Sequence, residues 1–200
     1  MEITTQMIKE LREATSAGVL DCKKALQESN GNFEEAAEYL REKGLAAVAK
    51  RSDREASEGL VHAYIHPGNR VGVLLEVNCE TDFVARTDTF QDLTHNLALH
   101  IAFAAPKHLT REDVPEEEIE SEKRLYRNQA LEEGKPEHII DRIVEGKLEK
   151  YFEQVCLMEQ PYVKDEEKTV QELFNDAIAK LGENVIMRRF TRYELGESLE

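Results

Sequence analysis

The stretch VHAYIHPGNRVGVLLEVN, residues 61–78, decides the fold class, because it alternates like a β-hairpin in a chain that is otherwise rich in helical patterns. Apolar residues occupy every second position on both sides of HPGNR, and this central segment has the Pro, Gly and Asn that turns favour. Successive side chains of a strand point to opposite faces of a sheet. The stretch therefore predicts a hairpin with one strongly apolar face.

Helical patterns follow this hairpin, and a third strand ends the chain. Apolar residues spaced by three and four predict helices over about 88–104 and 169–181. Residues 185–193 are apolar at first and then alternate Arg with aromatic residues or Thr, which predicts a final strand. Residues 59–200 are therefore predicted to form an α+β core, in which helices pack on an antiparallel sheet of about three strands.

A helical hairpin is predicted within the core, over about 115–155. Pro115 favours the start of the first arm, and Gly134-Lys135-Pro136 predicts the turn. The second arm has apolar residues at a spacing of three and four, namely Ile140, Ile143, Val144, Leu148, Phe152 and Val155. Two such arms should pack antiparallel as a short coiled coil.

Residues 1–44 are predicted to form a small bundle of three helices. Turn residues interrupt the helical pattern at 16–18 and at 29–32, and the third helix is predicted to end at Gly44. A bundle of this size has a thin core and often serves as a docking module. The small and charged residues 45–58 predict a partly helical linker between this bundle and the core.

The charge balance excludes some classes of partner. The chain has 26 Lys and Arg against 41 Asp and Glu, a formal net charge of −15, so its surface should repel phosphate backbones and we expect no nucleic-acid binding. No apolar stretch approaches the ~20 residues of a membrane span, and the first residues lack the pattern of a signal peptide. Three widely spaced cysteines fit a reducing compartment. We therefore expect a cytoplasmic protein that does not enter the membrane.

Enzymatic chemistry has little support in the sequence. Glycine-rich phosphate loops are missing, and His62 and His66 would lie about 13 Å apart on a strand, which does not fit a metal site. Cys79 could be a nucleophile, but it lacks a recognisable hydrolase signature and is better interpreted as a small apolar residue at a strand end. His100 lies on the apolar side of a helix, as a satisfied core histidine would. We expect no enzymatic activity, no metal and no cofactor.

Two longer segments resemble the signatures of the elongation factor Ts family. They are LREATSAGVLDCKKAL, residues 11–26, and VLLEVNCETDFVAR, residues 73–86. Shorter similar segments follow in order: LHIA at 99–102, EGKP at 133–136, VEGK at 144–147, QPYV at 160–163 and MRRF at 187–190. Ser16 replaces the usual Gly, and Val19-Leu20 replaces Met-Met, but both changes keep a small residue and apolar bulk. The resemblance covers essentially the whole chain.

The resemblance implies a fold, a partner and an activity. The N-terminal bundle should be a ubiquitin-associated-like domain, and the chain should promote GDP release from elongation factor Tu, which it would meet in the GDP-bound and the nucleotide-free state. The exchange corner of the family lies at Thr81, Asp82, Phe83 and Val84 and enters near the Mg²⁺ and phosphate site. By this resemblance Phe83 is the wedge, and Asp82 helps to disrupt the groups that support the metal.

Further contacts follow from the same resemblance. Leu11, Arg12, Val19 and Lys23 would grip the GTP-binding domain of elongation factor Tu, and His100 is a weaker contact candidate. Exchange also requires that the factor bind the nucleotide-free partner more tightly than the GDP-bound one, since the coupling is reciprocal. A factor that bound both states equally would not change the balance between them.

A homodimer is predicted because only one copy of the core is found, as in the short form of the family. The final strand, with Met187, Phe190 and Tyr193, is the candidate surface for a pair that would form a two-plus-two complex with elongation factor Tu.

Two other functions compete with exchange. An adaptor could use the three-helix module alone, but it has no reason to carry Thr81-Asp82-Phe83-Val84. A hydrolase would depend on Cys79.

Overall fold

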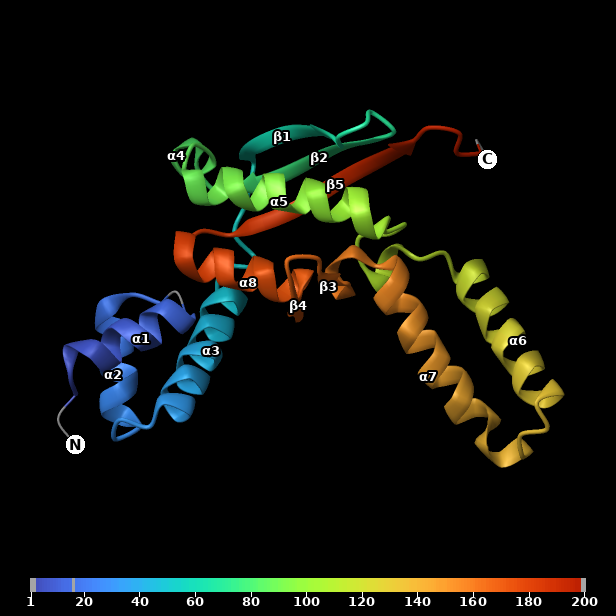
Figure 1. The fold of residues 1–200 in the computed structure, drawn as a ribbon, viewed down its shortest axis with the longest axis horizontal. Coiled ribbons are helices and arrows are strands. Elements are labelled where there is room, and N and C mark those ends of the chain that lie inside the picture. The colour runs from blue at the N-terminus through green and yellow to red at the C-terminus, as the bar shows by residue number, and fades with distance from the viewer. Residues whose placement is uncertain (1–2, 16, 199–200) are drawn as a thin grey trace. The chain divides into compact units, whose positions relative to one another are not determined.

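The computed structural model describes residues 3–15 and 17–198, and Figure 1 shows its elements in chain order. Its contacts divide the chain into two compact units, one of Met1–Val61, Glu76–His95 and Glu172–Arg188, and one of His62–Leu75, Asn96–Gln171 and Arg189–Glu200. Helices and strands occur together, which confirms the predicted α+β class. Within the described residues, no helix combines the length and the apolar character needed to cross a membrane.

Three N-terminal helices form a bundle of their own. They are α1 (Thr5–Thr15), α2 (Val19–Glu28) and α3 (Phe33–Ala49). Polar and glycine residues mark the ends of these helices. Thr4 Oγ1 accepts a hydrogen bond from the amide of Met7 at 3.2 Å, and Gly31, with φ 83°, follows the end of α2. Buried side chains from all three helices close the small core: Leu11, Cys22, Ala25, Leu26, Ala36 and Leu40.

The third helix is longer than predicted. We expected it to end at Gly44, but α3 continues to Ala49, so that prediction is wrong. A glycine within a helix costs only about 1 kcal/mol, and the following residues, LAAVA, are mostly strong helix formers. The helix therefore passes through the glycine and takes up the first third of the predicted linker.

The sheet has three antiparallel strands, as the sequence predicts, and their order is β1-β2-β5. These are β1 (Glu58–Ile65), β2 (Val71–Cys79) and β5 (Val185–Glu194). The turn between β1 and β2 closes with a hydrogen bond from the amide of His66 to the carbonyl of Val71, at 2.9 Å. Gly68, with φ 95°, supplies the backbone conformation that this turn requires.

The apolar residues of the hairpin lie on opposite faces of the sheet. On β2, Val73, Leu75 and Val77 are buried, but on β1 Val61 and Ile65 are about 60% exposed. A Cβ placed on Gly72 would lie 3.1 Å from Cδ1 of Ile65, so Ile65 shares a face with the even-numbered residues of β2. The single apolar face predicted for the hairpin is therefore wrong, and the sheet has a second, exposed apolar face.

The final strand also differs from the prediction. Val185 and Met187 are buried, whereas Phe190 is half-buried and Tyr193 is exposed. Met187 points into the core with the odd-numbered residues at the start of the strand, because those positions face the apolar interior. It is therefore unavailable as a surface for a second copy of the chain.

The predicted helical hairpin is confirmed as α6 (Glu116–Glu132) and α7 (Glu137–Val155), which pack side by side (Figure 1). Gly134, with φ 68°, forms the turn, and Pro136 precedes α7. Two hydrophobic clusters follow one another along the hairpin. The cluster near the tip has Ala130, Ile140 and Val144, and the cluster at the base has Val114, Tyr151, Phe152, Val155 and Cys156.

An ion-pair cluster fixes the base of the hairpin. Arg111, in the short 3-10 helix η1 (Arg111–Asp113), binds the carboxylates of Glu149 and Glu159, and its guanidinium lies 4.6 Å from the ring centre of Phe152. The hydrogen bonds that Arg111 donates, to Glu159 first and then to Glu149, raise the pKa of Arg111. The arginine therefore joins the segment before α6 to α7 and to the 3-10 helix η2 (Leu157–Glu159).

The remaining elements complete the core. They are α4 (Asp82–Ala85), α5 (Asp88–Ala104), β3 (Pro161–Tyr162), β4 (Asp165–Thr169) and α8 (Val170–Leu181). The helices predicted over 88–104 and 169–181 are thus confirmed. Strands β3 and β4 form a small second sheet that the sequence did not predict, because two residues are too few for a visible alternation.

Candidate functional site

The predicted exchange corner is a single helical turn that directly follows β2. The strand ends at Cys79, and Thr81 caps α4 with its hydroxyl oxygen, which accepts a hydrogen bond from the amide of Val84 at 3.4 Å. Thr is a favoured capping residue, and Asp82 in the first turn suits the positive end of a helix. The sequence TDFV therefore converts strand to helix within four residues, and it fixes where the side chains of Asp82 and Phe83 start.

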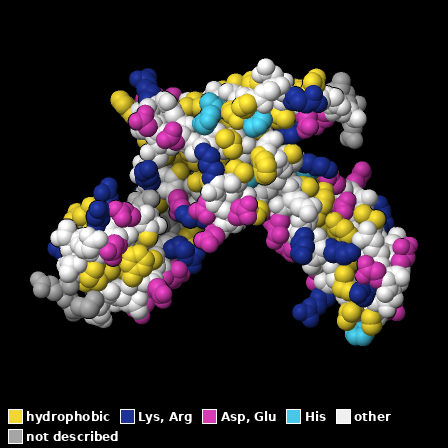
Figure 2. All heavy atoms as spheres, viewed as in Figure 1, with side chains coloured by type: hydrophobic (Ala, Val, Ile, Leu, Met, Phe, Trp, Pro, Cys, Tyr) yellow, Lys and Arg dark blue, Asp and Glu magenta, His cyan; other side chains and the backbone are white. Residues whose placement is uncertain are grey.

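Phe83 projects from this turn into solvent. Its side chain is 77% exposed, whereas Ala85, two residues further on, is buried. Figure 2 shows hydrophobic atoms at the surface beside α4, among acidic and basic side chains. A phenylalanine that filled a core would be buried, so Phe83 is not a core residue. It presents a large apolar group to whatever meets the corner.

Asp82 forms an exposed ion pair that is easily broken. Its carboxylate lies 2.8 Å from Nη2 of Arg86, one helical turn further along, and both side chains are substantially exposed. Ion pairs of this kind contribute little to stability, because water solvates both groups. A partner protein could therefore draw the carboxylate of Asp82 away from Arg86 at small cost.

The base of the corner is buried and chemically inert. Cys79 is fully buried, and its Sγ donates a hydrogen bond to the carbonyl of Thr81 at 3.1 Å. Burial, helped by the nearby charge of Glu183, raises the pKa of the Cys79 thiol to about 11. A thiol that stays protonated at neutral pH is a poor nucleophile, so this environment argues against a cysteine hydrolase.

Glu183 anchors the corner, and sequence reasoning missed it. Its carboxylate accepts hydrogen bonds from the amides of Glu80 and Thr81, at 3.1 and 3.0 Å, and from the Thr81 hydroxyl at 2.7 Å. The two partners are about a hundred residues apart in the chain, so no local pattern could reveal the contact. The only signal in the sequence is a glutamate in the turn between a helix and a strand.

Most of the predicted docking residues lie on the surface of the N-terminal helices. Arg12, Val19 and Lys23 are exposed. Leu11 is fully buried in the core of the bundle, so its side chain is not available to contact a partner. Leu20 was not predicted, although it is 81% exposed at the start of α2. The apolar pair Val19-Leu20 within the first signature was the signal that could have identified it.

His100 is placed where a direct contact with a partner protein is impossible. The ring is fully buried, its Nε2 lies 3.0 Å from Oε1 of Gln160, and its Nδ1 accepts a hydrogen bond from the amide of Val163 at 3.2 Å. Burial lowers the pKa of His100, which keeps the ring neutral. The core-histidine interpretation fits these contacts, and we do not propose His100 as a contact residue.

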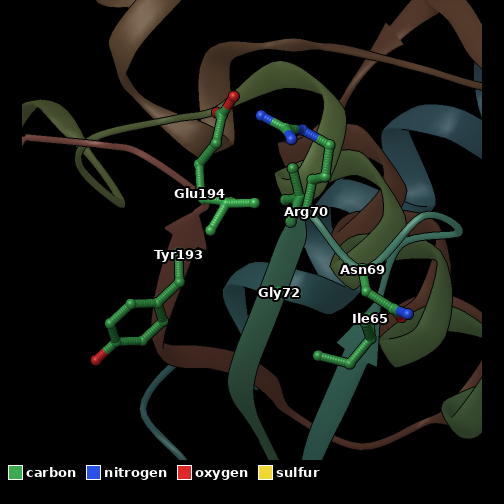
Figure 3. A pocket seen from close by; sticks show the side chains of 8 residues that line it. Ile65, Asn69, Arg70, Gly72, Tyr193 and Glu194 are labelled. Atoms are coloured by element: carbon green, nitrogen blue, oxygen red, sulfur yellow. The ribbon is translucent and has the colours of Figure 1, made fainter.

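A hollow of about 290 Å³ lies between the β1-β2 turn and the end of β5 (Figure 3). Its lining is made up of Ile65, Asn69, Arg70, Val71, Gly72, Tyr193, Glu194 and Leu195. The amide of Leu195 donates a hydrogen bond to the carbonyl of Arg70 at 2.8 Å, which holds the end of the chain against the turn. Arg70 and Glu194 are its only charged side chains. The hollow belongs to the exposed apolar face of the sheet.

The part of the chain that the structure describes offers no cluster of metal ligands. No three or more His, Cys, Asp or Glu side chains there are arranged to hold a metal ion. The features that stand out are therefore surfaces: the corner at Thr81–Val84, the start of α2, and the exposed apolar face of the sheet.

Comparisons with known proteins identify the family of the chain. The family described as "Elongation factor TS" matches residues 1–197. A protein of Moorella thermoacetica named "Elongation factor Ts" is 59% identical over 192 residues, which are 96% of this chain and 95% of that protein. Proteins of the same name from Heliobacterium modesticaldum and Caldanaerobacter subterraneus subsp. tengcongensis are 57% and 58% identical, over 98% and 99% of this chain and 92% and 99% of their own lengths. This chain therefore belongs to the elongation factor Ts family.

Proposed function

We propose that this chain is a guanine nucleotide exchange factor of translation elongation, which promotes GDP release from elongation factor Tu by inserting Asp82-Phe83 near the Mg²⁺ and phosphate site. The observation that carries the proposal is the 77% exposure of Phe83 on a helical turn whose base is buried. Burying such a side chain contributes about 1.5–3 kcal/mol. A partner that covers Phe83 only in its nucleotide-free form would gain this free energy in that state alone.

The mechanism needs contacts and no covalent chemistry. In the proposal Phe83 wedges between elements of the partner, and Asp82 leaves Arg86 to disturb the groups that support the metal. Because the nucleotide-free partner is bound more tightly, GDP is released, and by the same coupling incoming nucleotide expels the factor. We therefore propose no enzymatic activity, metal or cofactor for the chain itself. We also place it in the cytoplasm, where bacterial translation elongation takes place.

Docking is assigned to the N-terminal helices. Arg12 and Lys23 are exposed cations, and Val19 with Leu20 forms an exposed apolar pair. In the proposal these side chains bind the GTP-binding domain of elongation factor Tu. An apolar centre with charged neighbours is the usual composition of such an interface. In this scheme these side chains supply affinity for elongation factor Tu, whereas the corner promotes the release of GDP.

We propose further that two copies pair through the exposed apolar face of the sheet and form a two-plus-two complex with elongation factor Tu. Ile65, Leu74 and Tyr193 are large, exposed and apolar, and Ile65 and Tyr193 line the same hollow. Exposed apolar surface of this kind marks interaction sites.

With Met187 buried, the variant that tests the pair is Ile65→Glu, which should give a monomer by light scattering and lower exchange activity. A wild-type monomer with full activity in a one-to-one complex would contradict the pairing.

The exchange proposal is tested with fluorescent GDP bound to elongation factor Tu. Phe83→Ala should slow GDP release at saturating factor by more than tenfold and leave the melting temperature nearly unchanged. Phe103→Ala is a matched control, because Phe103 is also 77% exposed and should exchange like the wild type. If Phe83→Ala instead lost ~3–5 kcal/mol of stability, Phe83 would be a core residue and the wedge would be excluded.

A further inference from the structure

The chain segment between α8 and β5 holds the exchange corner, Thr81–Val84, in place. Gly182, with φ 75°, ends α8, and Glu183 and Asn184 form the turn into β5. From this turn the carboxylate of Glu183 reaches the amides of Glu80 and Thr81 and the Thr81 hydroxyl. Charge-assisted hydrogen bonds of this kind are stronger than neutral ones. Three of them converge here on the two residues that precede α4.

The contact is reciprocal. The amide of Asn184 donates a hydrogen bond to Oε1 of Glu80 at 2.7 Å, so each segment supplies one carboxylate to the backbone of the other. The side chain of Asn184 is buried and donates to the carbonyls of Ser52 and Arg54, at 3.3 and 2.8 Å. The turn at 183–184 thus joins the corner to the segment that follows α3. It ties together three stretches that are far apart in the sequence.

The Thr81 hydroxyl connects this anchor to the wedge. It donates to Glu183 and accepts from the amide of Val84, and a hydroxyl can do both at once. Glu183 therefore sets the direction of the Thr81 side chain, and Thr81 in turn caps the helical turn that carries Phe83. Without the carboxylate, the two amides before α4 would have only water as a partner.

From this geometry we propose that Glu183 is a positioning residue for nucleotide exchange: it holds Thr81 and the first turn of α4 so that Phe83 is presented in one orientation before the partner binds. The inference rests on the proposed function. A wedge that is already ordered does not have to lose conformational freedom on insertion. Glu183 touches neither the nucleotide nor the partner in this scheme, and it acts through Thr81.

The scheme predicts which kinetic quantity changes. Docking is assigned to the N-terminal helices, so removal of the anchor should leave the half-saturating concentration of factor nearly unchanged. The maximum rate of GDP release should fall, because a disordered corner inserts less often. General destabilisation would not separate the two quantities in this way.

Three substitutions separate the reach of the side chain from its charge. Glu183→Ala removes the acceptor. Glu183→Asp keeps the charge but is one methylene, ~1.5 Å, too short to reach both amides and the hydroxyl. Glu183→Gln keeps the length: its carbonyl oxygen can accept from both amides, and its NH2 group can donate to the Thr81 hydroxyl, whose oxygen can still accept from the amide of Val84. Glu55→Ala, at an exposed glutamate of the segment after α3, is the control for loss of one negative charge.

The experiment measures fluorescent GDP release from elongation factor Tu over a range of factor concentrations, with the full chain and with melting curves for every variant. Glu183→Ala and Glu183→Asp should lower the maximum rate about tenfold, while Glu183→Gln should stay within about threefold of the wild type. Glu55→Ala should match the wild type. Hydrogen exchange followed by NMR should show faster exchange of the Glu80 and Thr81 amides in Glu183→Ala, which reports the lost hydrogen bonds whatever the activity is.

The outcomes distinguish this inference from the function on which it rests. If Phe83→Ala in the same series exchanged like the wild type, the proposed function would fail. If Phe83→Ala were slow but Glu183→Ala and Glu183→Asp kept the full maximum rate, only the positioning role would be overturned. A raised half-saturating concentration with an unchanged maximum rate would also overturn it, since Glu183 would then act on docking. A slow Glu183→Gln with unchanged amide exchange would count against it as well.

Discussion

The exchange corner and the start of α2 both expose a large apolar side chain, but they hold it differently. Phe83 lies in a capped turn whose preceding residues bind Glu183, and the carbonyl of its capping residue, Thr81, accepts a hydrogen bond from the buried Cys79. Leu20 is the second residue of a helix whose N-cap, Gly18, has no side chain to cap it. The corner is therefore built for one fixed geometry. The start of α2 is built as an exposed surface, which fits a role in docking.

The difference also bears on which substitutions each region tolerates. At the start of α2, Val19-Leu20 stands where the signature of the family usually has Met-Met, and apolar bulk is all that the exposed position demands. At the corner, a change of one methylene at Glu183 is expected to break three hydrogen bonds. Four measurements test this difference between the corner and the start of α2.

The largest effect is expected beneath the docking surface. Leu11→Ala should lower the free energy of unfolding of the N-terminal bundle by about 2–5 kcal/mol, because it opens a cavity in a small core. Thermal unfolding followed by circular dichroism checks this. Leu20→Ala is the matched control, since it removes the same atoms from an exposed position and should melt like the wild type. Equal melting of both variants would mean that the bundle is packed differently from this structure.

Leu20→Ala should instead weaken docking. Loss of an exposed apolar contact at an interface costs about 1–2 kcal/mol, which corresponds to an increase of roughly tenfold in the half-saturating concentration for exchange. The maximum rate should stay the same, in contrast to Glu183→Ala. Leu131→Ala, at an exposed leucine near the tip of the helical hairpin, is the control and should leave both quantities unchanged. An unchanged half-saturating concentration for Leu20→Ala would remove this residue from the docking surface.

The Cys79 thiol, at the base of the corner, should be unreactive in the folded chain. Burial raises the pKa of the Cys79 thiol to about 11, so the thiolate is scarce below that pH and its population increases only as the pH approaches 11. Iodoacetamide at pH 8 should therefore label Cys79 in the folded chain far more slowly than in the chain unfolded by guanidinium, as measured by mass spectrometry. Cys79→Ser should keep full exchange activity. Rapid labelling at pH 8 would show that the corner opens.

The smallest effect is expected from the exposed ion pair between Asp82 and Arg86. Arg86→Ala breaks the exposed ion pair with Asp82, which contributes less than about 1 kcal/mol. Exchange should change by less than threefold, and the direction should be an increase, because the Asp82 carboxylate no longer has to leave Arg86. The comparison with Lys9→Ala, which breaks a similar exposed pair with Glu13 in α1, controls for the loss of one surface cation. A tenfold loss of activity would make Arg86 a contact residue.

Local patterns in the sequence predict much of this fold, because they arise from neighbours in the chain. The turn at His66–Arg70, the hairpin turn at Gly134 and the cap at Thr4 each depend on a few adjacent residues. Apolar spacing predicts the helix over 88–104 and the second arm of the helical hairpin, whereas Pro115 predicts the start of the first arm. The end of α3 was not, because a single glycine weakens a helix without stopping it when helix formers follow.

What the sequence could not predict depends on contacts between distant residues. Alternation on β1 marks an apolar face but does not say whether that face meets the core, and here Val61 and Ile65 remain exposed. The role of Glu183 needs a partner about a hundred residues away. These features are set by how the elements pack and not by any one of them.

The two hydrophobic clusters of the helical hairpin carry a consequence for how this arm could change in evolution. The cluster at the base includes Phe152, which lies against Arg111, while the cluster near the tip depends on Ala130, Ile140 and Val144. Tyr126 packs against both clusters, so whole helical turns added between them, in matching numbers on α6 and α7, would separate this shared contact but leave the buried residues of each cluster together. The base would keep its contacts, and the tip would keep its turn at Gly134. The hairpin is thus a spacer of adjustable length, whose reach can be altered without redesign of the core.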